Sequence, residues 1–236
     1  IHSFVVETVR PHLTNTSRRG RPVEITVERK VAASIRFLAG ASYGECILLL
    51  RCQGWSYVYS TLEEVCMAIV AAYPLRDPFQ PDILAQTTAS FARKAGAHYF
   101  PPIAGALDGL LLKIRCPTKG GKKQFCRKGY HAMLMLAMAD GDARILYYSV
   151  RHSGSTHDSL ACKTSPLQRA LDAGRLPATH VMLGDDAFSA NSAQILTPFS
   201  GPQVSGSKED TYNFFQSSLR MAIERECACA CACACA

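Results

Sequence analysis

The spacing of apolar residues changes near residue 100, from a helical period to the pattern of strands. The sequence predicts four helices before that point, over 27–38, 43–51, 56–69 and 82–94. Ser56 is the expected N-cap of the third helix, and short Gly-containing turns separate the first three. Helix, turn and helix in this order predict a small all-α, helix-turn-helix-like module over 1–75, followed by a linker and one helix over 76–100.

The predicted helix after Ser56 has two interpretations. In the first it lies in a DNA groove, with Ser56, Tyr57, Tyr59 and Ser60 near bases or phosphates. In the second it belongs to an ordinary helical bundle. The helix carries two glutamates and neither Lys nor Arg, which suits it poorly to a phosphate backbone, and both interpretations stay open.

After residue 100 the pattern is that of an α/β domain. Strands are expected over 106–114, 132–139, 144–150 and 180–183, and helices over 158–173 and 217–226. Asp140-Gly141-Asp142 is expected to turn the chain between the second and third strands. Three strands followed by helix, strand and helix predict a mixed sheet flanked by helices.

Composition places the chain among globular proteins of one large or two small domains. It has 236 residues, of which 48% are hydrophobic and 19% charged, and no apolar run is long enough for a membrane span. The start of the chain lacks the features of a signal peptide, and the missing initiator Met suggests a fragment. Six scattered cysteines without zinc-like spacing indicate reduced thiols in an intracellular protein.

The remaining five cysteines alternate with alanine over 227–236. Such a repeat is typical of a translated simple nucleotide repeat, so we expect a low-complexity tail without a packing role. It would replace a normal C-terminal continuation.

Three acids are candidates for a metal site. Asp108 interrupts the apolar run 105–114, Asp185 ends the fourth predicted strand, and Glu224 lies on the last helix. An unpaired buried carboxylate is costly, whereas carboxylates that face one cleft suit Mg²⁺ or Mn²⁺. Two such ions would activate a nucleophile for phosphodiester cleavage. Taken singly, each acid also has an ordinary structural explanation. Asp185 would be a turn residue, and Glu224 would form a surface ion pair with Arg220.

A run of basic residues follows the strand of Asp108. Between residues 113 and 128 there are seven Lys or Arg and no acid, and the formal net charge of the whole chain is +7. The candidates for nucleic-acid contact are Lys119, Lys122, Lys123, Arg127 and Lys128. Either this is a solvated hairpin, or it holds a polyanion beside the acids.

The segment Ser153-Gly-Ser-Thr-His157-Asp158-Ser also has two interpretations. Asp158, Ser155 or Thr156 would cap the following helix, which is the reading that local sequence favours. Alternatively His157 and Asp158 border the site, with His157 as a proton carrier or phosphate contact.

Several segments, in this order, resemble the nuclease domain of the Harbinger (PIF/Harbinger) transposases and the domesticated nucleases derived from them. They are Gly105-Ala-Leu-Asp108-Gly, Arg127-Lys-Gly-Tyr-His131, Gly154-Ser-Thr-His-Asp158-Ser, Leu183-Gly-Asp185-Asp-Ala-Phe188 with Leu196-Thr-Pro-Phe199, and Tyr212-Asn-Phe-Phe-Gln-Ser-Ser-Leu-Arg220 with Ile223-Glu224. The resemblance spans roughly residues 27 to 226.

This resemblance implies an RNase H-like fold over 101–226 and a catalytic triad of Asp108, Asp185 and Glu224 that binds two Mg²⁺ or Mn²⁺ ions. It implies cutting and joining of transposon DNA ends in the nucleus, with a Myb-like protein supplying part of the end recognition. It also favours DNA contact by the N-terminal helices, and it allows a homo-oligomer.

The sequence departs from the family pattern after Glu224. The family continues with a Cys-Ala-Phe-Gly-like helix and further packing helices, whereas here the Cys-Ala repeat follows Arg225-Glu226. Because catalytic carboxylates need rigid support, the alternative hypothesis is an inactive, truncated relic that binds DNA or a protein. A nuclease that acts on RNA is a third hypothesis, which the expected fold allows.

Overall fold

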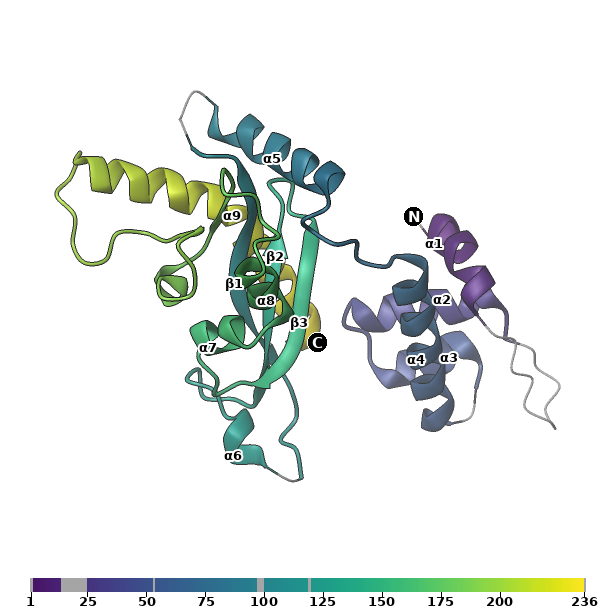
Figure 1. Ribbon diagram of the computed structural model, residues 1–236. Coiled ribbons are helices and arrows are strands. Elements are labelled where there is room, and N and C mark those ends of the chain that lie inside the picture. Colours follow the sequence, from purple (N-terminus) through teal and green to yellow (C-terminus); the bar gives the residue numbers. More distant parts are fainter. Residues whose placement is uncertain (1, 14–24, 53, 97–99, 119, 236) are drawn as a thin grey trace. The chain divides into compact units, whose positions relative to one another are not determined.

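The structure is a computed structural model that describes residues 2–13, 25–52, 54–96, 100–118 and 120–235 (Figure 1). In the last helix, the side chains of Ala222 and of every residue after Glu224 lie outside the description. The chain divides into two compact units, residues 1–74 and residues 75–234.

The first unit is helical. Its elements are α1 (His2–Val9), η1 (Arg10–His12), α2 (Val27–Leu38), α3 (Tyr43–Leu50) and α4 (Trp55–Ala72). The hydroxyls of Thr26 and Ser42 accept backbone N–H groups at the starts of α2 and α3, which satisfies donors that a helix N-terminus leaves free. A buried ion pair of 2.9 Å between Lys30 and Glu64 joins α2 to α4, so Glu64 serves the packing of this unit.

Helix α4, the third of the predicted helices, differs from its sequence-based description. It begins at Trp55, its N-cap is Gly54, and no side chain caps it, so the expected cap at Ser56 is wrong. Its buried face runs through Val58 and Val65, whereas Tyr59 is 51% exposed and lies against the Tyr43 ring at 4.7 Å. Successive residues of a helix point in different directions, so Val58 faces the core while its neighbour Tyr59 lies at the surface.

The second unit contains a five-stranded mixed sheet with the order β3-β2-β1-β4-β5 (Figure 1). Its strands are β1 (Ile103–Lys113), β2 (Ala132–Ala139), β3 (Ile145–Ser153), β4 (Val181–Leu183) and β5 (Ile195–Leu196). The strands β1, β2 and β3 pair antiparallel, while β4 runs parallel to both β1 and β5. This mixed, helix-flanked sheet agrees with the predicted α/β class.

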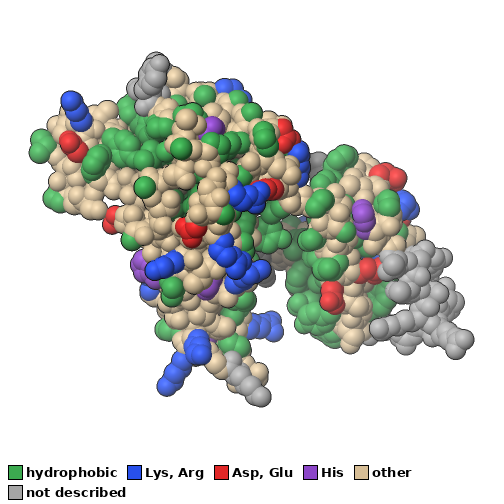
Figure 2. Space-filling view, viewed as in Figure 1, with side chains coloured by type: hydrophobic (Ala, Val, Ile, Leu, Met, Phe, Trp, Pro, Cys, Tyr) green, Lys and Arg blue, Asp and Glu red, His purple; other side chains and the backbone are tan. Residues whose placement is uncertain are grey.

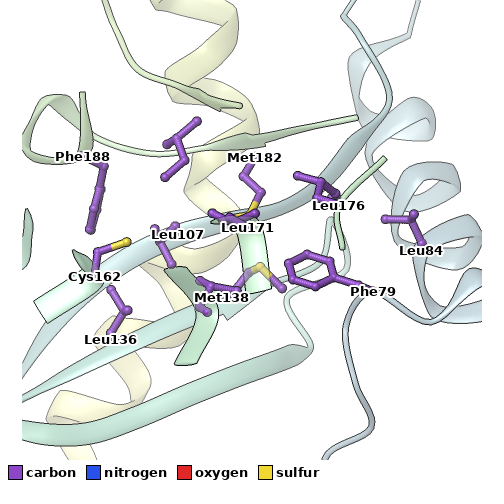
Figure 3. Packing of buried hydrophobic residues seen from close by; sticks show 13 residues of the cluster. Phe79, Leu84, Leu107, Leu136, Met138, Cys162, Leu171, Leu176, Met182 and Phe188 are labelled. Atoms are coloured by element: carbon purple, nitrogen blue, oxygen red, sulfur yellow. The ribbon is translucent and has the colours of Figure 1, made fainter. Parts of the chain in front are cut away.

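Helices cover both faces of this sheet. The helices of this unit are α5 (Pro81–Ala95), α6 (Gly121–Gln124), α7 (Asp158–Lys163), α8 (Pro166–Asp172), η2 (Asp186–Phe188) and α9 (Lys208–Cys235), of which α6 lies in the loop after β1. On one face α7, α8 and η2 pack around Leu107 and Leu136, as Figure 3 shows for Cys162, Leu171 and Phe188. On the other face Leu219 and Ile223 of α9 pack against Ala106 and Leu110. Alternate residues of β1 therefore enter two separate cores.

Several elements of this unit differ from the prediction, which also did not include α6 or η2. The helix expected over 158–173 is two helices, because Ser165 caps α8 and Pro166 occupies its first turn. The two-residue strand β5 was not predicted. The last helix begins at Lys208 instead of residue 217 and continues to Cys235 through the expected tail, where no Gly or Pro interrupts it and Ala favours helix.

Among the described residues, no helix has both the length and the apolar character needed to cross a bilayer.

Candidate active site

The sheet register places Asp108 and Asp185 side by side. Ala106 of β1 pairs with Leu183 of β4 in parallel orientation, and each aspartate lies two residues further along its chain. Side chains two residues apart along an extended chain point to the same face of the sheet. Both carboxylates therefore lie at the same height along the paired strands. The Asp108 Oδ1 atom accepts the Gly109 N–H at 2.9 Å, and the Asp185 Oδ1 atom accepts the Ala187 N–H at 3.1 Å.

The edge of β1 is open at this point. The strand β4 ends at Leu183, whereas β1 continues to Lys113 and pairs with β2 along that length. Residues from Asp108 onward therefore have β2 on one side and a cleft on the other. Ligands in open α/β sheets bind at such carboxyl ends of strands.

Asp108 is largely buried, with 20% of its side chain exposed. Burial raises the pKa of its carboxyl above the ordinary value, and the negative charges of Asp185 and Asp158 act in the same direction. The Gly109 N–H and the Arg220 guanidinium oppose this rise in pKa. The fold thus holds an acid where its charged form needs a cation.

A third aspartate reaches the same place from the α7 face. Asp158 is the first residue of α7, but the cap is His157, whose Nδ1 atom accepts the Ser159 N–H at 3.3 Å. Capping by Asp158, Ser155 or Thr156, which the local sequence favoured, is therefore wrong. Only 14% of the Asp158 side chain is exposed.

Gly109 makes this approach of Asp158 sterically allowed. A Cβ atom built on Gly109 would lie 2.4 Å from Asp158 Oδ1 and 2.5 Å from its Cγ. Burial raises the pKa of Asp158, the charge of Asp185 raises it further, and Arg127, at 4.0 Å from Asp158 Oδ2, lowers it. A glycine inside a strand is the sequence signal for such a close approach.

Arg220 and Glu224 reach the site from α9. The guanidinium Nη2 atom of Arg220 lies 4.0 Å from Asp108 Oδ1 and 3.5 Å from Glu224 Oε1. The Arg220 side chain is 10% exposed and that of Glu224 47%. The ion pair between Arg220 and Glu224 exists as the sequence suggested, but its arginine is buried in the site and not on the surface. The sequence signal for this ion pair was the four-residue spacing of Arg220 and Glu224 on one helix.

Three of the site carboxylates, Asp108, Asp158 and Glu224, line a cleft of about 540 Å³. Its walls include Asp108, Gly109, Asp158 and Glu224 on the acidic side, and Arg127 and Lys128 on the basic side. His157 also lines the cleft. The cleft therefore joins carboxylates to cations, as a site for a polyanion and a metal would require.

The basic loop after β1 carries α6 at its tip. Lys122, Lys123, Arg127 and Lys128 are exposed, and Lys119 lies outside the described residues. Figure 2 shows blue side chains and no red ones at the tip of the second unit around α6. The loop is held by backbone hydrogen bonds from Cys126 to Tyr130 and from Ile114 to His131.

The donors of this cluster fit a hard divalent cation in their chemistry, since they are carboxylate oxygens. In the arrangement described, however, no three His, Cys, Asp or Glu side chains of the described ranges form a group that could hold a metal ion. The Arg220 guanidinium supplies a positive charge between Asp108 and Glu224 instead.

Comparison with known proteins identifies the family. A family model described as DDE superfamily endonuclease matches residues 107–230, more than half of the chain. The proteins named "Putative nuclease HARBI1" of Rattus norvegicus and of Homo sapiens are each 23% identical over 226 residues, which is 94% of this chain and 62% of theirs. The chain thus spans less than two thirds of the length of these relatives. No solved structure matches it.

The matched region contains Asp185 together with Asp108, Asp158 and Glu224, and the last three line the cleft. The chain therefore belongs to the DDE superfamily endonucleases.

Proposed function

We propose that this chain is a Harbinger-type, metal-dependent DNA endonuclease and transposase that hydrolyses and joins phosphodiester bonds at the ends of a transposon. Asp108, Asp185 and Glu224 are its catalytic triad. The observation that carries the proposal is the parallel pairing of β1 with β4, which brings Asp108 level with Asp185 beside a cleft also lined by Glu224.

Members of this superfamily generally use divalent metals, and the carboxylates of the triad are the residues that would hold Mg²⁺ or Mn²⁺ here. When bound, two such ions activate an attacking water or 3′-hydroxyl and stabilise the leaving oxygen. The chain's own contribution is to orient the donors. The Gly109 N–H fixes Asp108, the Ala187 N–H fixes Asp185, and the packing of α9 sets Glu224.

The basic wall of the cleft is proposed to hold the DNA backbone. Arg127 and Lys128 line the cleft itself, while Lys122 and Lys123 extend the positive surface along the loop. Cations that contact phosphates release counterions, so affinity depends steeply on salt. His157 is exposed at the cleft, and its Nδ1 atom is engaged by the Ser159 N–H. Its Nε2 atom is then left to donate a hydrogen bond to a phosphate oxygen.

The test of catalysis is cleavage of DNA that carries the matching terminal inverted repeats, in the presence of Mn²⁺. Asp108→Asn and Asp185→Asn should each reduce the cleavage rate by about 10²- to 10³-fold, since each removes a group that stabilises developing charge. Asp142→Asn is the matched control, because Asp142 lies at the β2–β3 turn, paired with Arg93 at 2.7 Å. Cleavage that survives loss of either site aspartate would refute the assigned mechanism.

The test of DNA binding is the salt dependence of affinity. Lys122→Ala and Lys123→Ala should weaken binding to all sequences alike, and each should lower the slope of log affinity against log salt by about one. DNA binding that depends on salt, without metal-dependent cleavage of any substrate, would favour the inactive, DNA- or protein-binding alternative. An equal preference for RNA would argue against the transposase assignment.

The remaining parts of the proposal follow from the relation to HARBI1 and the Harbinger-like motifs. We place the chain in the nucleus, where its DNA substrate is, with a Myb-like partner that supplies part of the end recognition. Co-purification with such a partner, and its effect on the affinity for the inverted repeats, would test this.

A further inference from the structure

One face of α9 carries three polar side chains at four-residue intervals, Gln216, Arg220 and Glu224. Residues spaced in this way lie one above another on a helix. Gln216 is fully buried and Arg220 is 9% exposed, so two of the three are inside the protein. Large polar groups at such positions need partners, and the partners show what the face does.

Gln216 is fixed by the end of the sheet. Its Nε2 atom donates to the Gly184 carbonyl at 2.7 Å and to the Leu196 carbonyl at 3.2 Å. Because both partners are acceptors, the amide cannot be turned over, and Oε1 must point away from them. That Oε1 atom is buried and receives no hydrogen bond from the described residues.

Arg220 carries the complementary group, a buried hydrogen-bond donor without an acceptor among the described residues. Its Nη2 atom faces Asp108 and Glu224, but its Nε atom is buried and finds no acceptor among the residues that the structure describes. A buried acceptor without a donor therefore lies one helical turn from a buried donor without an acceptor. Both atoms lose their hydration without regaining a hydrogen bond, which makes the present arrangement costly at this point.

The position of the guanidinium is also in conflict with a metal. A cation that faces Asp108 and Glu224 repels a divalent ion bound by the same carboxylates, and this repulsion is strong where water is scarce. An ion can be held there only if the guanidinium recedes. One helical turn away on α9, the Gln216 Oε1 atom is a buried acceptor without a donor among the described residues.

We propose that Arg220 is a positioning residue which acts as the built-in counter-ion of the site. It neutralises Asp108 and Glu224 in the metal-free chain, and it withdraws along α9 to donate from Nε to Gln216 Oε1 when a divalent cation binds. Gln216 thereby sets the metal affinity without touching the metal. This inference rests on the proposed function, since it takes the metal to bind at these carboxylates.

The exchange predicts opposite effects for its two partners on Mn²⁺ affinity, measured by calorimetric titration of the full chain. Arg220→Gln removes the competing cation and should tighten Mn²⁺ binding about tenfold, the change expected for one charge-assisted hydrogen bond. Gln216→Met removes the alternative acceptor and should weaken binding by a similar factor. Gln168→Met is the matched control, because Gln168 is also a buried glutamine of this unit and does not line the cleft.

A double variant separates this role from simple support. If Gln216 only held Gly184 and hence Asp185 in place, Gln216→Met would weaken Mn²⁺ binding with or without Arg220. Under the exchange, Gln216→Met should have no effect on affinity in the Arg220→Gln background. An undiminished loss in the double variant would overturn the proposal.

The Arg220 Nε–H resonance gives a readout that does not depend on the folding of any variant. In ¹⁵N-labelled wild-type chain, addition of Mg²⁺ should shift this resonance and slow its exchange with solvent. An unchanged resonance at saturating Mg²⁺ would overturn the exchange. Tighter Mn²⁺ binding by Arg220→Gln, lost when Asp108 is also replaced, supports the exchange. Weaker Mn²⁺ binding by Arg220→Gln overturns the exchange alone. A chain that binds no Mn²⁺ overturns both this inference and the proposed function.

Discussion

Replacing Gly109 by Ala would test how closely Asp158 approaches the strand of Asp108. The new Cβ atom would lie 2.4 Å from Asp158 Oδ1, while ordinary contacts begin at 3.4 Å. The carboxylate must therefore withdraw by about 1 Å. The three atoms nearest to the added Cβ all belong to Asp158, so the clash has one partner.

The expected changes in unfolding free energy and in cleavage rate follow from this displacement. Overpacking of a filled site costs about 1 to 3 kcal/mol of unfolding free energy. The loss of backbone freedom in the unfolded chain returns about 0.5 to 1 kcal/mol when Gly becomes Ala. A 1 Å misplacement of a group in an active site reduces the rate about 100-fold, so the cleavage rate should fall by this order if Asp158 supports catalysis.

Stability is measured by denaturant unfolding of four proteins, namely wild type, Gly109→Ala, Asp158→Ala and the double variant. Gly109→Ala should destabilise the wild-type chain. In the Asp158→Ala background it should be neutral or stabilise by up to about 1 kcal/mol, because the clashing atoms are gone. The same four proteins are compared for Mn²⁺-dependent cleavage.

The outcome that would refute this reasoning is an equal destabilisation by Gly109→Ala in both backgrounds. The strand would then reject a side chain at this position for a reason other than Asp158.

Three further predictions concern charge, helix propensity and thiol chemistry. Burial and the charge of Asp185 raise the pKa of Asp158, so the folded chain binds this proton more tightly than the unfolded chain. Wild-type stability is therefore lost as the pH rises through the folded pKa, and Asp158→Asn should raise the Tm of metal-free protein at pH 7. This gain should shrink toward about pH 4, the ordinary pKa of an aspartate, and a gain that persists in acid would contradict the sign. Gly44→Ala, at an exposed position of α3 where the nearest side-chain atom would be 3.7 Å away, should stabilise the chain by about 0.5 kcal/mol in calorimetry, and a loss of stability would argue against this helix. Burial raises the pKa of Cys162 to about 12, so alkylation at pH 8 followed by peptide mass mapping should label exposed Cys116 and spare Cys162 in the folded chain. Equal labelling of the two would show that the core around Cys162 opens readily.

Much of the local structure could be predicted from the sequence. The helix 27–38 and the strand 132–139 have the predicted bounds, because periodicity and flanking turn residues are properties of neighbouring positions. The errors came where a single residue outweighed the periodic pattern or where an element was too short to show one. Pro166 divides the predicted helix 158–173, and a two-residue strand such as β5 is too short to carry a period.

In the candidate site, too, the sequence predicted some features and left others undecided. The sequence indicated Asp108, Asp185 and Glu224 through their places on the predicted strands and last helix, the Harbinger-like motifs implied that they form a triad, and the charge of the loop identified the basic segment. It left open whether Asp158 caps a helix or faces the site. That choice was decided by the start of the helix, because the cap is His157, whose ring accepts the Ser159 N–H, and Asp158 is the first residue inside α7.

By itself the sequence determined which segments form helices and strands, which family the motifs resemble, and which side chains carry charge. Only the tertiary structure decided that Asp108 lies level with Asp185, that Asp158 fits against Gly109, and that Arg220 is buried between carboxylates. Local structure depends on residues a few positions apart. These contacts join residues many positions apart, and they are fixed by the parallel register and by the helices that pack on the two faces of the sheet.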